Sequence, residues 1–256
     1  MKVCSPEDRM KLPSERPITL HLNDREIATV QGSPRDLDEM AVGFFVAEGL
    51  VTDRGALRSI DVDHKRGLVY VATGEATPSG DAYRSRLITS GCGKGVTFSS
   101  VEHARGMTRV EEGPKLAPAD VHELMLRMAR SAEAYRETGG MHSCGLAGSG
   151  EVVLLREDVG RHNAVDKVLG RAWLDRLPLE EMVMLTTGRI SYEMAVKAAR
   201  ARISLVVSRT AVTDQAADVG STLGLTLVGY ARGRRMTVYT CPHRIRGPKE
   251  IERDVG

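Results

Sequence analysis

Short apolar runs separated by polar turns predict that the chain begins with β-hairpins. Residues 18–22 and 26–30 are rich in β-branched and apolar side chains, and the polar stretch between them suits a tight turn. Residues 59–63 and 67–73 repeat this arrangement. A further short run at 86–89 predicts one more strand.

The stretch after the first hairpin has the spacing of a helix. Ser33 suits the N-cap, with proline at the next position and a carboxylate three residues after the cap. Gly49 predicts the end of the helix. Because two of the three phenylalanines fall here, we expect this helix to fill a small core. Its apolar face is formed by Leu37, Met40, Ala41, Phe44 and Phe45.

A polar stretch rich in proline and glycine, residues 111–118, separates this region from the rest. We interpret it as the boundary between an N-terminal α+β domain, residues 1–112, and a C-terminal α/β domain, residues 113–256. Asp120 and Glu123 resemble a capping box at the start of a long helix that ends at Gly139-Gly140. The apolar stripe of this helix is Val121, Leu124, Met125, Met128, Ala129, Ala132 and Tyr135.

Beyond this helix, apolar runs alternate with helical patterns. Alternation of this kind predicts a layered α/β domain with a largely parallel sheet, and the last two strands look like a hairpin that makes one edge antiparallel. We expect residues 139–144 to form a loop. Strands are predicted at 152–155, 182–185, 203–207, 225–229 and 236–239, and helices at 164–174, 192–200 and 214–223.

The composition is typical of a soluble globular protein. The 256 residues are 41% hydrophobic and 27% charged, and the net charge of +2 indicates neither a nucleic-acid nor a membrane partner. No apolar run reaches the roughly 18 residues that span a membrane, and the start lacks the apolar core of a signal peptide, so we expect a cytoplasmic protein. Four separate cysteines form no C-x-x-C pair, so we expect no metal site.

The most distinctive chemistry lies at Cys92, which has glycine on both sides and Lys94 two residues further on. Glycines let a second molecule approach the sulfur closely. A nearby cation, or free backbone N–H groups, lowers the pKa of a thiol and makes it nucleophilic. This pattern fits an exposed reactive thiol, and it fits equally well an ordinary turn around a small buried residue.

Polar residues gather where predicted strands end and helices begin. The turns at 156–167, 186–191 and 208–213 each contain arginine and lead into a helix. Because the carboxyl ends of parallel strands share one edge of a sheet, the three turns together favour an anionic, phosphate-bearing ligand. Helix caps and salt bridges enrich the same positions. In residues 156–167, an ion-pair network fits as well as contact with a ligand.

Two histidines and a basic hairpin add to this picture. His162 by itself is typical of a hydrogen-bonded structural histidine. His142 lies beside glycines and Cys144, so its loop could form the wall of a site. The hairpin at 230–235 carries three arginines, and it is either a solvated turn or a ligand-binding segment.

The segment 156–167, Arg-Glu-Asp-Val-Gly-Arg-His-Asn-Ala-Val-Asp-Lys, closely resembles the signature of the formate dehydrogenase accessory proteins, the FdhD sulfurtransferase family. The resemblance runs from about Pro17 to Ile245. Supporting matches are residues 187–194, 139–142, 224–230 and 239–240, the helix that follows Ser33-Pro34, and the Cys92 loop.

This resemblance implies a cytidine-deaminase-like three-layer α/β/α domain, a smaller N-terminal α+β domain and a homodimer. It implies that Cys92 takes sulfur from a cysteine desulfurase as a persulfide and passes it to the molybdenum of bis-molybdopterin guanine dinucleotide, before that cofactor enters formate dehydrogenase. A guanine nucleotide would mimic the cofactor. The residues expected at the cofactor are Tyr230, Ala231, Arg232, Gly233, Arg234, Arg235, Arg189, His142, Arg156, Arg161 and His162.

One departure from the family pattern affects the chemistry. Many members have a C-x-x-C pair in this loop, whereas here Thr89 stands at the first position. Either a single thiol carries the sulfur, or Cys144 serves as its partner. A non-catalytic chaperone that holds the molybdenum cofactor is the alternative function. A zinc-dependent deaminase is disfavoured, because the H-x-E and P-C-x-x-C elements of such enzymes are missing.

Overall fold

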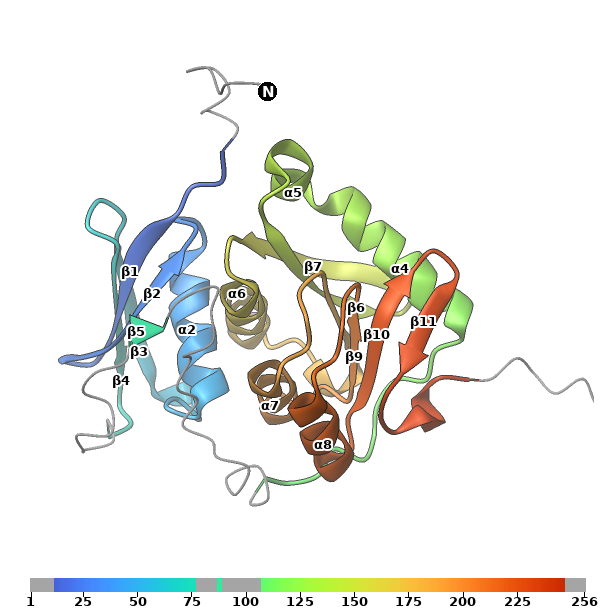
Figure 1. Cartoon of the computed structure of the whole chain (residues 1–256). Helices are drawn as coiled ribbons and strands as arrows, with labels where there is room; N and C mark the ends of the chain where they lie inside the picture. The colour runs from blue at the N-terminus through green and yellow to red at the C-terminus, as the bar shows by residue number, and fades with distance from the viewer. Residues whose placement is uncertain (1–11, 77–86, 89–106, 247–256) are drawn as a thin grey trace, which may run out of the picture.

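The computed structural model describes residues 12–76, 87–88 and 107–246. These residues form a mixed α/β structure with two β-sheets and six α-helices. The elements stack in the order N-terminal sheet, α2, α6, C-terminal sheet and α4 (Figure 1). In this part of the chain, no helix is both long and apolar enough to cross a lipid bilayer.

The N-terminal sheet contains both predicted hairpins. Strand β1 (Arg16–Leu22) pairs with β2 (Arg25–Gly32), and β3 (Leu57–Asp63) pairs with β4 (Leu68–Thr73), each in antiparallel fashion. Strands β1 and β4 lie side by side in parallel. The short strand β5 (Leu87–Ile88) runs parallel to β2 at the far edge, so the strand order is β3-β4-β1-β2-β5.

Helix α2 (Leu37–Glu48) covers one face of this sheet, and Gly49 ends it in the left-handed conformation, as predicted. The predicted start is wrong, because Asp36 occupies the cap position and no side chain caps the helix. Ser33 is buried, and its backbone N–H donates to the carboxylate of Asp158 in the C-terminal part. A tertiary contact has therefore replaced the local cap that the sequence indicates.

The C-terminal sheet has the strand order β11-β10-β9-β8-β6-β7. Strands β8, β9 and β10 are parallel neighbours, β6 is antiparallel to both β7 and β8, and β11 is antiparallel to β10. The predicted antiparallel edge hairpin is therefore confirmed. The prediction of a largely parallel sheet is wrong, because three of the five strand pairs described in this sheet are antiparallel. The strands are β6 (His142–Gly148), β7 (Glu151–Asp158), β8 (Val183–Thr186), β9 (Leu205–Ser208), β10 (Thr226–Arg232) and β11 (Arg235–Val238).

Strand β6 corrects the prediction of a loop at 139–144. Its sequence, His-Ser-Cys-Gly-Leu-Ala-Gly, contains no β-branched residue, so its local β-propensity is weak. The strand is nevertheless enclosed between β7 and β8, and the residues from Ser143 to Ala147 are buried. Pairing on both sides determines its conformation.

Five α-helices belong to the C-terminal part. Helix α4 packs on one face of the sheet, while α6, α7 and α8 pack on the other. The predicted long helix is interrupted at Ala132, and α6 begins three residues earlier than predicted. The helices are α4 (Pro118–Ser131), α5 (Glu133–Thr138), α6 (Arg161–Leu174), α7 (Tyr192–Arg200) and α8 (Asp214–Leu223), and 3-10 turns lie at Arg54–Ala56, Leu179–Glu181 and Pro242–Arg244.

Helices α2 and α6 form the contact between the two sheets, and they cross at two glycines. A Cβ atom built on Gly43 would lie 1.8 Å from the carbonyl oxygen of Asp166. One built on Gly170 would lie 1.8 Å from the carbonyl oxygen of Glu39. The two backbones therefore touch directly.

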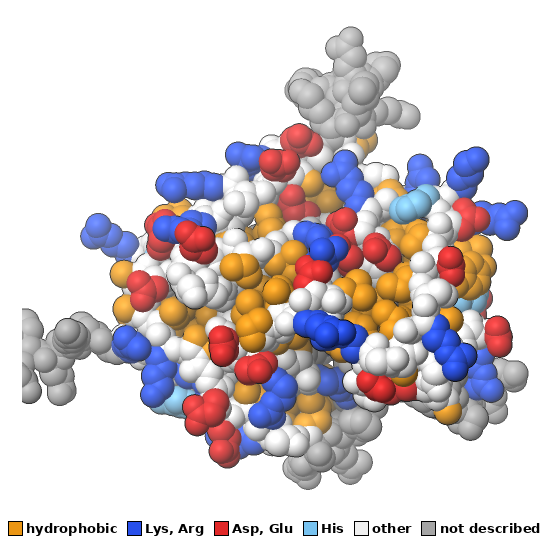
Figure 2. Space-filling view, turned by 180° about the vertical axis from the view of Figure 1, so that it is seen from behind, with side chains coloured by type: hydrophobic (Ala, Val, Ile, Leu, Met, Phe, Trp, Pro, Cys, Tyr) orange, Lys and Arg blue, Asp and Glu red, His pale blue; other side chains and the backbone are white. Residues whose placement is uncertain are grey.

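Seen from behind, hydrophobic side chains gather near the middle of the molecule, with charged groups around them (Figure 2).

The predicted boundary segment lies along the C-terminal sheet. The backbone N–H of Val110 donates to the carbonyl of Leu223, and Leu116 bridges to Ile245. Arg244, which is buried, donates to the carbonyls of Val110 and Glu111. The division of the chain into two domains at residue 112 stays a prediction.

Candidate functional site

Four strands of the C-terminal sheet, β7, β8, β9 and β10, run in the same direction. Strands β8, β9 and β10 are parallel neighbours, and β7 shares their direction because β6, which lies between β7 and β8, is antiparallel to both. Their carboxyl ends therefore share one edge of the sheet, the usual ligand side of an open α/β sheet. We call the segments at this edge the rim. The rim comprises residues 158–163 at the end of β7, 186–191 at the end of β8, 208–213 at the end of β9, and 230–235 at the hairpin of β10 and β11. It also includes residues 142–143, because the antiparallel strand β6 begins at this edge.

Hydrogen bonds join the turns of the rim to one another. The backbone N–H of Ser143 donates to Oγ1 of Thr187 at 2.9 Å, and the N–H of Thr187 donates to the carbonyl of Ser143 at 3.0 Å. The next turn is attached as well, because Oγ of Ser208 donates to the carbonyl of Gly188 at 2.7 Å and Oγ1 of Thr210 donates to that of Thr187 at 3.2 Å. These bonds fix the spacing between the turns.

The rim has an excess of exposed positive charge. Its turns and hairpin expose five arginines, and in the described residues none of the five forms an ion pair. Nε of Arg232 donates to the backbone carbonyl of Arg209 at 2.7 Å, which ties the hairpin to the turn after β9. Exposed guanidinium groups bind phosphate in bidentate fashion. The five are Arg189, Arg209, Arg232, Arg234 and Arg235.

The hairpin has an unusual backbone at its start. Tyr230 has φ = 51°, an uncommon value for a residue with a side chain, and it is exposed. The pairing of β10 with β11 shifts register between Gly229 and Arg232. Ala231 is buried and Gly233 has φ = 55° at the turn. Local strain of this kind is concentrated at functional sites.

Both predicted histidines lie at the rim, and both are uncharged at neutral pH. Burial and the nearby guanidinium of Arg161 lower the pKa of His142, and the same causes lower the pKa of His162 to about 3. Nε2 of His162 lies 3.2 Å from Oγ of Ser191 and 3.2 Å from Oε2 of Glu193. Both histidines therefore act as neutral hydrogen-bonding groups and add no charge to the rim.

The low pKa of His162 predicts acid sensitivity. A histidine with a pKa near 6.5 in the unfolded chain and about 3 in the folded protein stabilises the fold fully above pH 6.5, and this contribution is lost as the pH falls. Because of His162, we expect the free energy of unfolding to decrease by about 2 kcal/mol when the pH falls from 7 to 5.

Urea unfolding of wild type and His162→Gln at both pH values measures this. Burial raises the pKa of Asp166 to about 6, so this residue also titrates in the same pH range. Its contribution to the pH dependence is present in both wild type and variant, and it cancels when the two are compared. The stability difference between wild type and variant should shift by about 2 kcal/mol between the two pH values. A difference that is the same at both would show that His162 is not the group responsible.

Not every predicted residue faces the rim. Arg156 donates from Nε to Oε2 of Glu39 at 2.6 Å and from Nη2 to Oε1 at 2.8 Å, and thus forms a bidentate pair with α2. Arg161, the first residue of α6, packs its Cβ against Gly188, where an added methyl would lie only 2.7 Å away. The structure brings Arg161, the two histidines, Arg189 and the hairpin together, and it turns Arg156 toward the N-terminal part.

Sequence reasoning missed a second set of residues, which we call the buried node: Ser33, Asp158, Asn163 and Lys167. Asp158 and Lys167 are fully buried and lie 2.7 Å apart. Three of the four belong to the segment 156–167, whose mixture of charges had indicated an ion-pair network as one of two interpretations. Asp158 and Lys167 do form such an ion pair, so this interpretation is confirmed for these two residues.

Cys144 is placed differently from the prediction. Cys144 lies in the middle of β6 with no exposed surface, and burial raises the pKa of its thiol well above the usual value. It is thus a core residue and not part of a loop. Cys92, the predicted sulfur carrier, lies outside the described residues.

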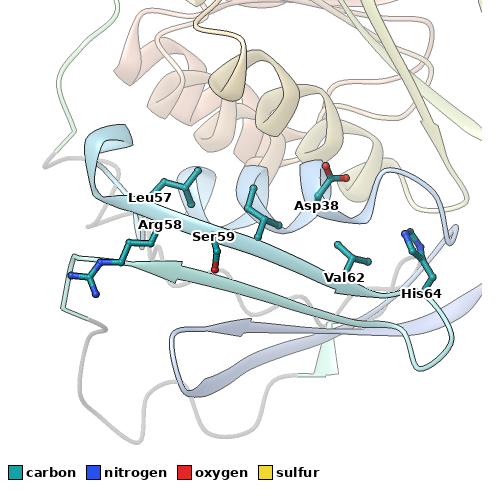
Figure 3. Close-up of a pocket in the computed structure, with 7 residues that line it drawn as sticks. Asp38, Leu57, Arg58, Ser59, Val62 and His64 are labelled. Carbon is teal, nitrogen blue, oxygen red and sulfur yellow. The ribbon is translucent and has the colours of Figure 1, made fainter.

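Two hollows lie away from the arginines of the rim. One, of about 650 Å³, lies between the edge strand β3 and α2, and contains none of the predicted site residues (Figure 3). The other, of about 440 Å³, lies where the segment around Ser33 meets α5, and Arg156 lines it. Among residues 12–76 and 107–246, no three His, Cys, Asp or Glu side chains are grouped so that they could hold a metal ion.

Comparison with known proteins identifies the family. The model of the FdhD/NarQ family matches residues 13–246. The "Sulfur carrier protein FdhD" of Halalkalibacterium halodurans is 34% identical over 92% of this chain and 88% of the relative, and that of Bacillus subtilis is 32% identical over 96% and 93%. A crystal structure described as a candidate formate dehydrogenase accessory protein from Desulfotalea psychrophila matches with a TM-score of 0.75 and 29% identity, over 92% of this chain and 90% of that one. Matched along nearly its whole length, this chain belongs to the FdhD/NarQ family.

Proposed function

We propose that this protein is a sulfur carrier required for formate dehydrogenase activity. Cys92 takes sulfur from a cysteine desulfurase as a persulfide and passes it to bis-molybdopterin guanine dinucleotide, which is held at the rim as cargo. The names of the relatives support the sulfur-carrying role, and the name of the structural neighbour supports the link to formate dehydrogenase.

The observation that carries this proposal is the set of exposed arginines at the rim. The cargo contains two guanine nucleotides, and hence several phosphate groups. Binding such a polyanion calls for guanidinium groups and free backbone N–H groups at helix starts. The turns before α7 and α8 both supply exposed arginines, and no side chain caps the start of α7. The neutral histidines add hydrogen-bonding groups without the desolvation cost of a buried charge.

The direction of β5 supports the pairing of this rim with Cys92. Leu87 and Ile88 run parallel to Thr29 and Val30 of β2, and β2 leads directly to Ser33, which binds Asp158 at the rim. Strand β5 itself therefore points toward the rim. Cys92 follows four residues later, and four residues span at most about 14 Å.

A single thiol is sufficient for the first step. The thiolate of Cys92 attacks the outer sulfur of the desulfurase persulfide, the S–S bond of that persulfide breaks, and the desulfurase leaves as a thiolate. No disulfide forms within the carrier in this step, so the step needs no second cysteine. The burial of Cys144 accords with this single-thiol chemistry.

The test is the intact mass of the full chain after incubation with a cysteine desulfurase and cysteine. We expect wild type to gain the mass of one sulfur atom and Cys92→Ala to gain none, with Cys144→Ala as the matched control that still gains it. An Arg189→Ala/Arg235→Ala variant should load sulfur normally but bind GDP, a probe for the guanine end of the cargo, about tenfold more weakly for each lost phosphate contact.

The outcomes separate the two candidate functions. No sulfur on wild type, with an active desulfurase, would refute the carrier and favour the cofactor-holding chaperone. Sulfur on Cys92 with unchanged GDP binding in the arginine variant would refute the rim as the cargo site. The cytidine-deaminase-like fold, the homodimer and the cytoplasmic location remain part of this proposal.

A further inference from the structure

We infer that the buried node is a positioning device that holds the strand pair β2–β5 against the rim, and that Asn163 is its positioning residue. This inference rests on the proposed function, because it concerns how the thiol after β5 is brought to the cargo. It gives part of the segment 156–167 a role that requires no contact with a ligand.

The centre of the buried node is the carboxylate of Asp158, which accepts four hydrogen bonds. Oδ1 accepts from the backbone N–H of Gly160 at 2.8 Å and from Nδ2 of Asn163 at 3.0 Å. Oδ2 accepts from the backbone N–H of Ser33 at 3.0 Å and from Nζ of Lys167 at 2.7 Å. A carboxylate has about four acceptor sites, so this group is saturated and its orientation is fixed.

Most of these groups also bind the end of β2. Nδ2 of Asn163 donates to the carbonyl of Gln31 at 2.8 Å, and Nζ of Lys167 donates to the carbonyl of Ser33 at 3.2 Å. In return, Oγ of Ser33 accepts from the backbone N–H of Val159 at 3.2 Å. The end of β2 and the first two turns of α6 are thus held together by direct hydrogen bonds.

These hydrogen bonds are surrounded by tight packing at Gly32. A Cβ atom on Gly32 would lie 2.7 Å from Nδ2 of Asn163 and 3.4 Å from Oδ2 of Asp158. Strand β5 pairs with β2 at Thr29 and Val30, immediately before Gln31. Because α6 begins at the rim with Arg161, the same few bonds set the position of β5 relative to the rim.

Asn163 is the member of the node that can be removed with the least damage. Truncation of Asp158 or Lys167 leaves a buried charge without its partner, which by itself can unfold the protein. Asn163 is neutral and bridges Asp158 to Gln31 with one nitrogen. Its loss should loosen the register between β2 and the rim while the buried ion pair stays in place.

The experiment measures proximity and needs neither sulfur nor cofactor. In the full chain with Cys4→Ser and Cys241→Ser, Arg189→Cys introduces a thiol at the rim. Oxidised glutathione then converts this thiol and that of Cys92 to a disulfide, with release of two reduced glutathione molecules, and the equilibrium gives the effective concentration of the two thiols. Adding Asn163→Ala should lower that value about tenfold or more.

The matched control is Arg200→Ala. Arg200 donates to the carbonyl of Ala47, at the other end of α2 from the buried node, so its loss also weakens the contact between the two parts. It should change the effective concentration less than about twofold. A merely structural role for Asn163 would make the two variants alike when their stabilities in urea are similar.

Three results would overturn the inference: no disulfide in the chain that keeps Asn163, an effective concentration unchanged by Asn163→Ala, or an equal drop in Arg200→Ala. Failure of the proposed function is recognised separately, because sulfur loading is measured by mass on wild type. A chain that loads no sulfur but shows the expected pattern of disulfide formation keeps the positioning role and loses the carrier role.

Discussion

Gly170→Ala is expected to destabilise the protein by about 3 kcal/mol, because helices α2 and α6 touch backbone to backbone at this position. The new methyl would lie 1.8 Å from the carbonyl oxygen of Glu39 and 2.7 Å from the backbone nitrogen of Gly43. Neither atom can rotate away as the end of a side chain can, so the helices must separate. Urea unfolding followed by circular dichroism measures the change in the free energy of unfolding.

The control is Gly220→Ala in α8, which is also a glycine inside a helix. There the new methyl would meet Cδ1 of Leu227 at 2.7 Å, which is the end of a flexible side chain. Alanine also favours a helix over glycine by about 1 kcal/mol, so this variant should cost much less than Gly170→Ala or be neutral. Similar losses for the two variants would contradict the backbone contact as the cause.

Lys167→Met is the second large effect, and we expect it to cost about 3–5 kcal/mol. Methionine has a similar length but leaves Asp158 buried with no opposite charge, and both residues of this pair are 0% exposed. The carboxylate keeps three neutral donors, which cannot replace the ammonium group. The free energy of unfolding in urea, measured at pH 7, shows the loss.

A double-mutant cycle with Asp158→Asn identifies its origin. When both charges are removed, no unpaired charge remains, so the double variant should be more stable than the sum of the two single losses predicts, by about 1 kcal/mol or more. Additive losses would mean that the pair does not interact as its geometry indicates. The same cycle tells whether the buried node is held by charge or by its neutral hydrogen bonds.

Much of the fold follows from local patterns. The hairpins at β1–β2 and β3–β4, helix α2 with its end at Gly49, and helices α7 and α8 with their observed ends could all be predicted from apolar spacing and breaker residues. These elements have a clear period and a clear stop, and that is the information a sequence holds at short range.

The predictions that were wrong concern residues whose conformation or partner depends on residues far away in the sequence. Strand β6 has weak propensity and exists because β7 and β8 enclose it. Ser33 has the chemistry of a helix cap, yet Asp158, 125 residues away, takes its N–H. Arg156 was expected at a ligand and is instead paired with Glu39, 117 residues earlier. Nothing in the neighbourhood of any of these residues indicates its partner.

The sequence by itself determined the family, through the segment 156–167, and it located the arginine-bearing turns that meet at the rim. Only the tertiary structure decided which members of that segment face the rim and which are buried against the N-terminal part. The physical reason is that the residues next to a charged side chain in the sequence do not determine whether that side chain faces the rim or is buried. Its burial depends on a partner such as Lys167 for Asp158 or Glu39 for Arg156, which only the folded arrangement of α2 and α6 brings within reach.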